Sequence, residues 1–435
     1  MFYAEGKSRP VNRNKAVCPG IHLHRLTAFL AALILSLTAV CGHAQEALRQ
    51  SLAGESAAEA NKQAQTTLGY YNLLLGPTTW QFNAGLGVEY NDNVHLSSDD
   101  AKGDVIFRPN LNTGMHWPIT EQNSLDINLG IGYSAYLLNP DLSQFYINPG
   151  SGISFDVYVG DFVINLHDRI SITEDAYQNP TAGGSGNTEL ENTIGFNTTW
   201  DMNKAVMTLG YDHVNYASLG SGSSSRPDGM SENFFFTAGA RLRPEIVTGV
   251  EAGGSIVNYD QTTTTSPGAA QWNTGVFGQM QISEYLSARV SGGYTMYMPD
   301  AVAGNENIRD QGDFYFQVLL AHNVNKFLDY TLTAGRSIDF QYYGQPYDRY
   351  FVRLNPTWKF IRKFSLATPL WWERGTEVYV NAASYDQYGI GVTVGRQLTE
   401  KLSGQVYYRF VKETSELASW NYINNIVGLS LSYRF

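Results

Sequence analysis

The end of the chain alternates strictly between apolar and small or polar residues, up to the final residue. Apolar side chains stand at Val427, Leu429, Leu431, Tyr433 and Phe435. Successive residues of a β-strand point to opposite faces of a sheet, so this period of two predicts a strand with one apolar and one polar face. The strand is predicted to end, with an aromatic residue, where the chain itself ends.

The same alternation recurs from about residue 79 onward. Clear examples lie at 80–90, 125–133, 286–296 and 402–410. About eighteen such segments can be distinguished between the connections that separate them. The prediction is an all-β fold in which every strand contributes to one shared apolar surface.

Short and long connections alternate between these segments. Gly160-Asp161, Ser283-Glu284 and Asn325-Lys326 are short, whereas 175–188 and 218–230 are long and rich in Gly, Ser, Asn or Asp. This pattern is typical of an antiparallel up-and-down transmembrane β-barrel, with short periplasmic turns and longer extracellular loops in the outer membrane of a Gram-negative cell. We therefore predict a barrel of about 18 strands over residues 79–435.

The first 44 residues have the pattern of a secretory signal peptide. Basic residues precede the apolar run Leu26 to Val40. That run is short for a transmembrane helix, which needs about 20 apolar residues, and it suits the apolar region of a signal. Gly42-His43-Ala44 predicts cleavage after Ala44. A lipoprotein signal ending at Cys41 is the alternative, although Val40 is large for that motif.

Residues 45–78 have no sustained period. Leu48 and Leu52 are four residues apart, but no apolar stripe continues beyond them. A periplasmic linker, a helix and a plug for the barrel are the alternative interpretations. Both cysteines, Cys18 and Cys41, lie in the predicted signal, so the mature chain is expected to contain no disulfide.

The composition argues against other classes of protein. Charged residues make up 16% of the chain, and the mean hydropathy is −0.25. A helical membrane protein would repeat long apolar runs, and none follows Val40. The net charge of −11 argues against nucleic acid as a partner. A soluble β-solenoid or sandwich would need neither the terminal aromatic residue nor the alternation of loop lengths.

Aromatic residues of the apolar face gather near the ends of the predicted strands. Near the short turns they are Trp80, Trp117, Phe162, Trp200, Trp358, Phe360, Phe364 and Phe435, and near the long loops Tyr90, Trp272 and Tyr342. Aromatic residues favour the two membrane–water boundaries, so two girdles are expected.

Four residues do not fit the simple pattern. Asp168 and Arg336 fall on the apolar face, where a charge is costly. Pro109 and Pro356 fall inside strands that need two hydrogen-bonded neighbours. Local β-bulges or different strand boundaries would account for them.

Part of the sequence resembles a known group. The segments LGYYNLLLGP (68–77), GLGVEYNDNV (85–94) and DVIFRP (104–109) are similar to the start of the outer-membrane porins called β-barrel porin 2. Members of that group are associated with exopolysaccharide or capsule systems. The resemblance implies a role in polysaccharide export, with export components as partners, and it implies no catalytic residue.

The final strand also resembles the signal that the barrel-assembly machinery recognises in outer-membrane barrels. By that resemblance, Leu429, Leu431, Tyr433 and Phe435 would form an assembly signal. Outer-membrane lipid and lipopolysaccharide are the other expected partners of such a barrel.

The predicted inward face carries charged residues that could line a lumen. The basic candidates are Arg108, Arg169, Arg241, Arg243, Arg289, Arg353 and Arg409. Charged rings can select ions or sugars. The alternative is a wall of mixed, mutually neutralised charge, and Arg241 and Arg243 lie near a short turn, where they would mark only the periplasmic mouth.

No pattern for catalysis, a metal or a cofactor stands out. Asn91-Asp92-Asn93 offers oxygen ligands for Ca²⁺ without EF-hand spacing, and a solvated loop is the simpler interpretation. Asp212-His213 is a weak candidate for a catalytic dyad. We predict that the protein is not an enzyme.

The functional prediction is a porin-like passive channel for secreted polysaccharide or small hydrophilic solutes. The loop 175–188 is the best candidate for a constriction of its lumen. The alternatives are a structural or adhesive barrel with a closed lumen and a transporter of hydrophobic compounds plugged by residues 45–78.

Overall fold

A computed structural model describes residues 71–174, 188–219, 228–260, 268–300, 310–340, 346–361, 363–378 and 383–435. These residues form strands and two single-turn 3-10 helices. Among them, no helix is long and apolar enough to cross a membrane.

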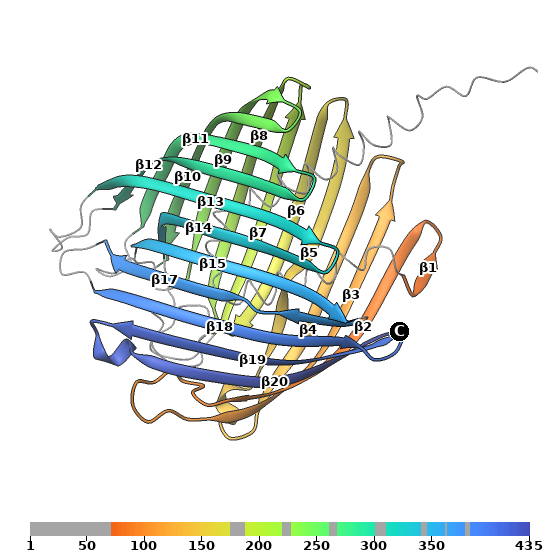
Figure 1. The fold of residues 1–435 in the computed structure, drawn as a ribbon, viewed down its shortest axis with the longest axis vertical. Coiled ribbons are helices and arrows are strands. Elements are labelled where there is room, and N and C mark those ends of the chain that lie inside the picture. The colour runs from red at the N-terminus through yellow and green to blue at the C-terminus, as the bar shows by residue number, and fades with distance from the viewer. Residues whose placement is uncertain are drawn as a thin grey trace, which may run out of the picture. The chain divides into compact units, whose positions relative to one another are not determined.

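The elements follow one another as simple hairpins (Figure 1). In chain order they are β1 (Leu73–Leu75), β2 (Thr78–Asn91), β3 (Asp104–Pro118), β4 (Ser124–Tyr136), η1 (Pro140–Leu142), β5 (Gln144–Val159), β6 (Phe162–Glu174), β7 (Thr188–Asp201), β8 (Ala205–Ser218), β9 (Gly229–Arg243), β10 (Ile246–Tyr259), β11 (Ala269–Ser283), β12 (Leu286–Pro299), β13 (Gln311–Asn325), β14 (Leu328–Phe340), β15 (Pro346–Ile361), β16 (Phe364–Ala367), β17 (Leu370–Glu377), β18 (Ser384–Gln397), β19 (Leu402–Ser415), η2 (Ala418–Trp420) and β20 (Tyr422–Arg434).

These strands form a closed antiparallel barrel. Each pairs with its neighbour in sequence, and β20 pairs with β2 over Asn83–Asn91, which closes the sheet. β16 and β17 are two parts of one strand, separated at Thr368-Pro369, and β1 lies outside the ring. The ring therefore has 18 strands, which confirms the predicted fold class. Closure leaves no open sheet edge, as a lipid environment requires.

The outer surface of the barrel is apolar. Leu86, Leu129 and Val276 point outward, and Val276 remains 63% exposed. Such a continuous apolar wall is stable when it faces lipid, and the closed barrel that carries it is that of an outer-membrane protein.

Aromatic girdles mark both ends of this wall. At the turn end, Phe162 stacks on Trp200 with ring centroids 5.0 Å apart. At the loop end, the centroids of Trp272 and Tyr294 are 6.3 Å apart. The residue Tyr342, predicted for the second girdle, lies outside the described residues.

The two prolines cause no change of register. Pro109 pairs with Leu86 and Pro356 with Tyr330, and these two ladders are continuous. On the other side, the pairing of β3 with β4 skips Arg108 and Pro109, and that of β15 with β16 and β17 skips Asn355 and Pro356, with the same register before and after each gap. Pro356 lies beside the break between β16 and β17. The bulge is instead in β5, where the partners on both sides shift near residues 148–151. Gly150 has φ of 94° there, a conformation that favours glycine.

Asp168 and Arg336 do point outward, and each has partners. The Asn192 amide donates a hydrogen bond to Asp168 at 2.7 Å. Arg336 donates two to Asp348, at 2.9 and 2.8 Å, and also contacts Asp313. Pairing with carboxylates lowers the cost of placing the guanidinium on this face.

The N-terminal hairpin is joined to the C-terminus at the seam of the barrel. β1 pairs with the start of β2 (Leu73 opposite Trp80) and so extends the line of β20 beyond its last residue. The Asn72 side chain accepts a hydrogen bond from the Phe82 N–H (2.8 Å) and donates to the carbonyl oxygens of Phe82 (2.9 Å) and Phe435 (2.8 Å). Figure 1 shows β1 beside the C-terminus at the turn end.

Candidate functional site: the inner wall and the loop at its mouth

The most charged part of the inner wall lies on β15–β19. Arg349 and Arg353 contact the same oxygen of Glu373, at 3.2 and 3.4 Å. The Tyr385 hydroxyl donates to the other oxygen at 2.7 Å. All four side chains are buried, and Arg349 is only 2% exposed. One carboxylate therefore neutralises two guanidinium groups in a region of low dielectric constant, where unbalanced charge has a large effect.

A third arginine stacks on an aromatic ring in the same region. Arg409 lies 5.3 Å from the ring centre of Trp371, a cation–π contact. Trp371 lies against Gly389, where a Cβ atom would come within 1.8 Å of the indole. Glycine is therefore required for the ring to lie flat on the wall.

Polar atoms of this cluster remain without a partner in the described structure. They are Nε of Arg353, Nε and Nη2 of Arg409, and Oε1 of Glu413. Buried polar atoms are rarely left unpaired in proteins. We name Arg349, Arg353, Arg409, Glu373 and Glu413 the arginine cluster, which carries three positive and two negative formal charges.

Two other predicted arginines are paired with one acid each. Arg108 donates to Glu89 from Nε (3.0 Å) and Nη2 (2.8 Å). Arg289 donates to Glu251 at 2.8 Å. At these two positions the inner wall has mutually neutralised charges, as the alternative interpretation of the sequence predicted.

The remaining predicted arginines lie outside the arginine cluster and outside these two ion pairs. Arg169 lies on the inward face of β6. Arg241 donates to Asp201 at 3.0 Å and also contacts the Asn203 carbonyl in the β7–β8 turn. Arg243 is the last residue of β9 and is exposed. Arg241 and Arg243 therefore belong to the turn end of the barrel.

The loop 92–103 between β2 and β3 folds into the barrel mouth. Leu96 is 2% exposed and packs with Trp371, Val411 and Tyr422 of the inner wall. Val94 packs separately with Ile106 of β3 and Tyr136 of β4, and Leu142 of η1 packs against them. Leu96 has φ of 49°, an uncommon conformation for leucine that this packing supports.

Hydrogen bonds hold the loop to the last strand. The Asn424 amide donates to Asn91 Oδ1 (2.7 Å) and to the Asn93 carbonyl (2.9 Å). Asn425 donates to both oxygens of Asp92, at 2.7 Å each. The sequence Asn91-Asp92-Asn93 is thus neither a solvated loop nor arranged as a calcium site. Among the described residues, no group of three or more His, Cys, Asp or Glu side chains could hold a metal ion.

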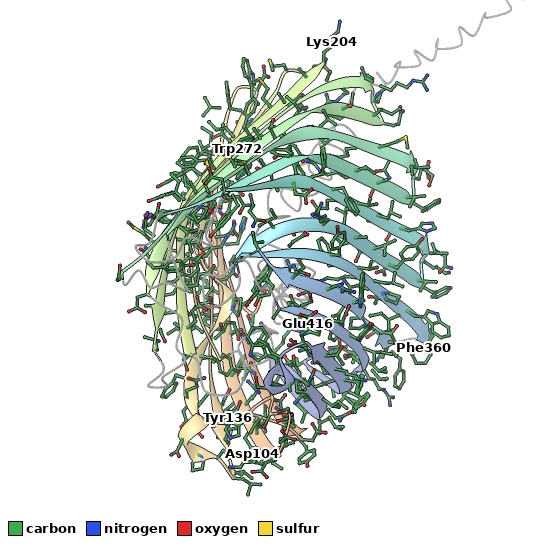
Figure 2. The ribbon with its side chains drawn as sticks, turned by 90° about the vertical axis from the view of Figure 1, so that its left-hand side faces the viewer. Asp104, Tyr136, Lys204, Trp272, Phe360 and Glu416 are labelled. Atoms are coloured by element: carbon green, nitrogen blue, oxygen red, sulfur yellow. The ribbon has the colours of Figure 1, made fainter. Side chains whose placement is uncertain are left out.

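The rim beside this loop is ordered by one carboxylate. Asp104 accepts hydrogen bonds from the N–H groups of Leu137 (3.0 Å), Leu138 (2.9 Å) and Asn139 (2.8 Å). Figure 2 shows Asp104 and Tyr136 together at this rim, away from Lys204 in the β7–β8 turn. The turn that follows β4 is therefore fixed against β3.

The Asp212-His213 pair does not form a dyad. Asp212 points inward and contacts His167 at 2.8 Å, whereas His213 points outward and contacts Glu232 at 2.9 Å. The period of two places neighbouring residues on opposite sides of the wall.

Sequence reasoning missed several residues of the site. Arg349 and Glu373 were not among the candidates, although Arg349 shares the parity of Arg353. The constriction was placed at 175–188, which lies outside the described residues apart from Thr188, and the loop 92–103 was overlooked. Val94 and Leu96, two apolar residues in a polar loop, were the available signal.

Solved structures similar to this chain are outer-membrane proteins and porins. Pseudomonas aeruginosa OpdK matches with 9% identity and a TM-score of 0.45, over 82% of this chain and 98% of that one. Pseudomonas aeruginosa OccK2 (OpdF) has 10% identity and a TM-score of 0.48, covering 83% and 98%. A BenF-like porin from Pseudomonas fluorescens has 9% identity and a TM-score of 0.46, covering 82% and 99%. No protein-family model and no curated protein matches the sequence, so the resemblance to the β-barrel porin 2 group stays a prediction.

Proposed function

We propose that this barrel is a passive outer-membrane channel that favours small hydrophilic anions. The observation that carries the proposal is that the inward-folded loop and the arginine cluster meet at Trp371. Leu96 of the inward-folded loop packs on Trp371, and Arg409 stacks on the same ring. A solute that passes the loop therefore moves close to the arginine cluster, which has an excess of one positive charge.

The electrostatic argument depends on burial. Charges exposed to bulk water are strongly screened, whereas Arg349, Arg353 and Glu373 are shielded from it. The field of a buried, net positive cluster extends into the adjoining lumen and raises the local concentration of anions.

The size of the barrel supports a channel. Barrels of about 16–18 strands usually leave an aqueous lumen, and this ring has 18. The inward-folded loop 92–103 narrows the mouth and so favours small solutes over a broad passage. A polysaccharide conduit is implied by the family resemblance of residues 68–111, and the experiment below distinguishes it.

The test is single-channel recording of the purified barrel in a planar bilayer with a salt gradient. We expect stable conductance and a reversal potential on the anion-selective side. Arg409→Gln should move the reversal potential toward zero, whereas Arg241→Gln at the turn end should leave it unchanged.

Three outcomes contradict the proposal. Selectivity for cations would contradict the proposed effect of the arginine cluster. A silent barrel supports a structural role or a plug. Passage of long polysaccharide chains through liposomes that contain the barrel, with little selectivity among small ions, supports the conduit.

A further inference from the structure

The inner wall on β2–β4 contains a block of uncharged polar positions. In three adjacent rows across these strands, every inward residue is Asn, Gln or Gly. The rows run from Gln81 to Asn128, from Asn83 to Gly130 and from Gly85 to Gly132. Their neighbours in sequence, such as Leu111 and Leu129, are exposed on the outer surface. Because successive strand residues point to opposite faces, the block faces the lumen.

Strand β5 adds two side chains to this block at its bulge. Tyr146 lies opposite Gly132, and Asn148 follows it in the bulged part of the strand. We name these two residues and the asparagines of the block the asparagine patch, which consists of Asn83, Asn110, Asn112, Asn128, Asn148 and Tyr146.

Hydrogen bonds fix three amides of the patch in one orientation. The Asn148 amide donates to Asn112 at 2.8 Å, and the Asn112 amide donates to Asn110 at 3.0 Å. The side chains of Asn83 and Asn128 make no hydrogen bond to another described residue, and Asn128 is exposed. Each amide offers one acceptor and two donor hydrogens, so the patch keeps donors and acceptors for a solute.

Glycine residues let the side chains of the patch lie flat against the wall. A Cβ atom at Gly130 would come within 2.5 Å of both Asn112 Oδ1 and Asn148 Nδ2. A Cβ atom at Gly132 would come within 2.2 Å of the Tyr146 ring. The ring therefore takes the place of a side chain at Gly132, and it is only partly buried. The patch is thus a low surface of amide groups beside one aromatic ring.

The charges that border the patch are paired. On the loop side Arg108 donates to Glu89 at 2.8 Å, and on the turn side His116 contacts Asp126 at 2.7 Å. Between these two pairs, no inward position of β2, β3 or β4 carries a charged residue. The patch therefore differs from the arginine cluster, because it offers hydrogen bonds without favouring either sign of charge.

We propose that the asparagine patch binds small neutral sugars in the lumen. Sugar hydroxyl groups both donate and accept hydrogen bonds, as the amides do, and the C–H face of a sugar ring can pack on Tyr146. An apolar solute would leave the amides without partners, which is costly. Hydrogen bonds between uncharged groups are individually weak, so a bound sugar can leave again, as transport requires. The inference rests on the proposed channel only for the access of the sugar to the lumen.

Saturation-transfer NMR of the purified barrel with sucrose tests the proposal. The detergent must have no sugar headgroup, because such a headgroup would compete for the patch. Asn128→Leu conserves the shape of the side chain and breaks no hydrogen bond between described residues. Asn273→Leu is the matched control, since Asn273 is an inward amide of β11 that also lies against a glycine, Gly253. Heat-modifiable migration on a gel would confirm that each variant is a folded barrel.

We expect Asn128→Leu to weaken sucrose binding about fivefold, the effect of one lost hydrogen bond between uncharged groups. Asn112→Leu combined with Asn128→Leu should weaken it further, and Asn273→Leu should leave it unchanged. The proposal would be overturned by the absence of sucrose binding or by equal losses in Asn128→Leu and Asn273→Leu. Equal binding of a polyethylene glycol of similar size would also overturn it, because that polymer has no paired hydroxyl groups.

Current recordings separate this inference from the channel proposal. In a conducting barrel, sucrose should add current noise that Asn128→Leu reduces and Arg409→Gln does not. A barrel that binds sucrose but carries no current would support the patch and contradict only the channel. An anion-selective, conducting barrel that binds no sucrose would contradict only the patch.

Discussion

The inner wall differs between two parts of the barrel. On β15–β19 it is built of large and charged side chains, among them Arg349, Trp371 and Tyr385, which are buried. On β10–β12 it contains small residues such as Gly253 and Gly293, and its main ion pair is Arg289 with Glu251. The wall on β15–β19 is filled and charged, whereas the wall on β10–β12 combines small residues with a few large ones such as Phe277 and Tyr297. The polarity of a barrel lumen can thus be concentrated on one side, and the inward-folded loop docks against that side.

The seam, where β20 closes on β2, lies outside both of these walls and offers the test with the largest expected effect. Deleting Phe435 removes the hydrogen bond from its N–H to the Phe82 carbonyl (3.2 Å) and the acceptor for Asn72. We expect outer-membrane levels of the folded barrel to fall severalfold, because β20 must be recognised and must then close on β2. Immunoblotting of outer-membrane fractions with and without heating measures this, and normal levels would contradict an assembly role for the final residue.

The ion pairs of the two walls should differ in their contribution to stability. Glu373→Gln leaves two buried guanidinium groups without a carboxylate, and we expect a loss of about 3 kcal/mol in the free energy of unfolding. Glu251→Gln leaves only one guanidinium unpaired, that of Arg289, so its loss should be smaller. Urea unfolding in detergent, followed by tryptophan fluorescence, provides the comparison, and equal losses would mean that the two walls do not differ in this respect.

The docking of the loop can be weakened with one substitution. Leu96→Ser removes the buried side chain that contacts Trp371, at a cost of about 2 kcal/mol, which is roughly a thirtyfold shift toward the undocked loop. Single-channel recordings should then show larger and noisier conductance. Leu417→Ser, in the exposed β19–β20 connection, is the control and should leave the conductance unchanged. A conductance identical to the original protein would show that the loop does not limit flow.

The smallest expected effect concerns Asn72. Asn72→Ala removes the side-chain hydrogen bonds that join the N-terminal hairpin to the seam, and we expect a loss of about 1 kcal/mol in stability. Asn325→Ala removes two bonds to the N–H groups of Phe327 and Leu328 within one ordinary turn, and it serves as the control. The Asn72 variant should also lower the temperature at which the folded barrel changes its migration on a gel. An effect no larger than that of the control would mean that Asn72 stabilises only its own turn.

The sequence by itself determined the strands and their two faces. The period of two, the alternation of loop lengths and the aromatic residues near strand ends were sufficient for an antiparallel barrel of about 18 strands, because each strand of a barrel obeys the same local rule. Parity also placed Arg108, Arg289, Arg353 and Arg409 on the inner face. It gave Asp168 and Arg336 the outward position that they have.

Tertiary structure alone decided which of these residues meet. Arg349 and Arg353 share Glu373 because β15 and β17 pair in one particular register, and Arg409 reaches Trp371 across β18 at a position where Gly389 leaves space. The inward fold of loop 92–103 depends on contacts with β20, more than 300 residues away in sequence. The outward-pointing residues Asp168, Asn192, His213 and Glu232 likewise come together from four strands. Alternation fixes the side of the wall on which a residue lies, but register and loop packing fix its neighbours, because they depend on contacts between distant parts of the chain.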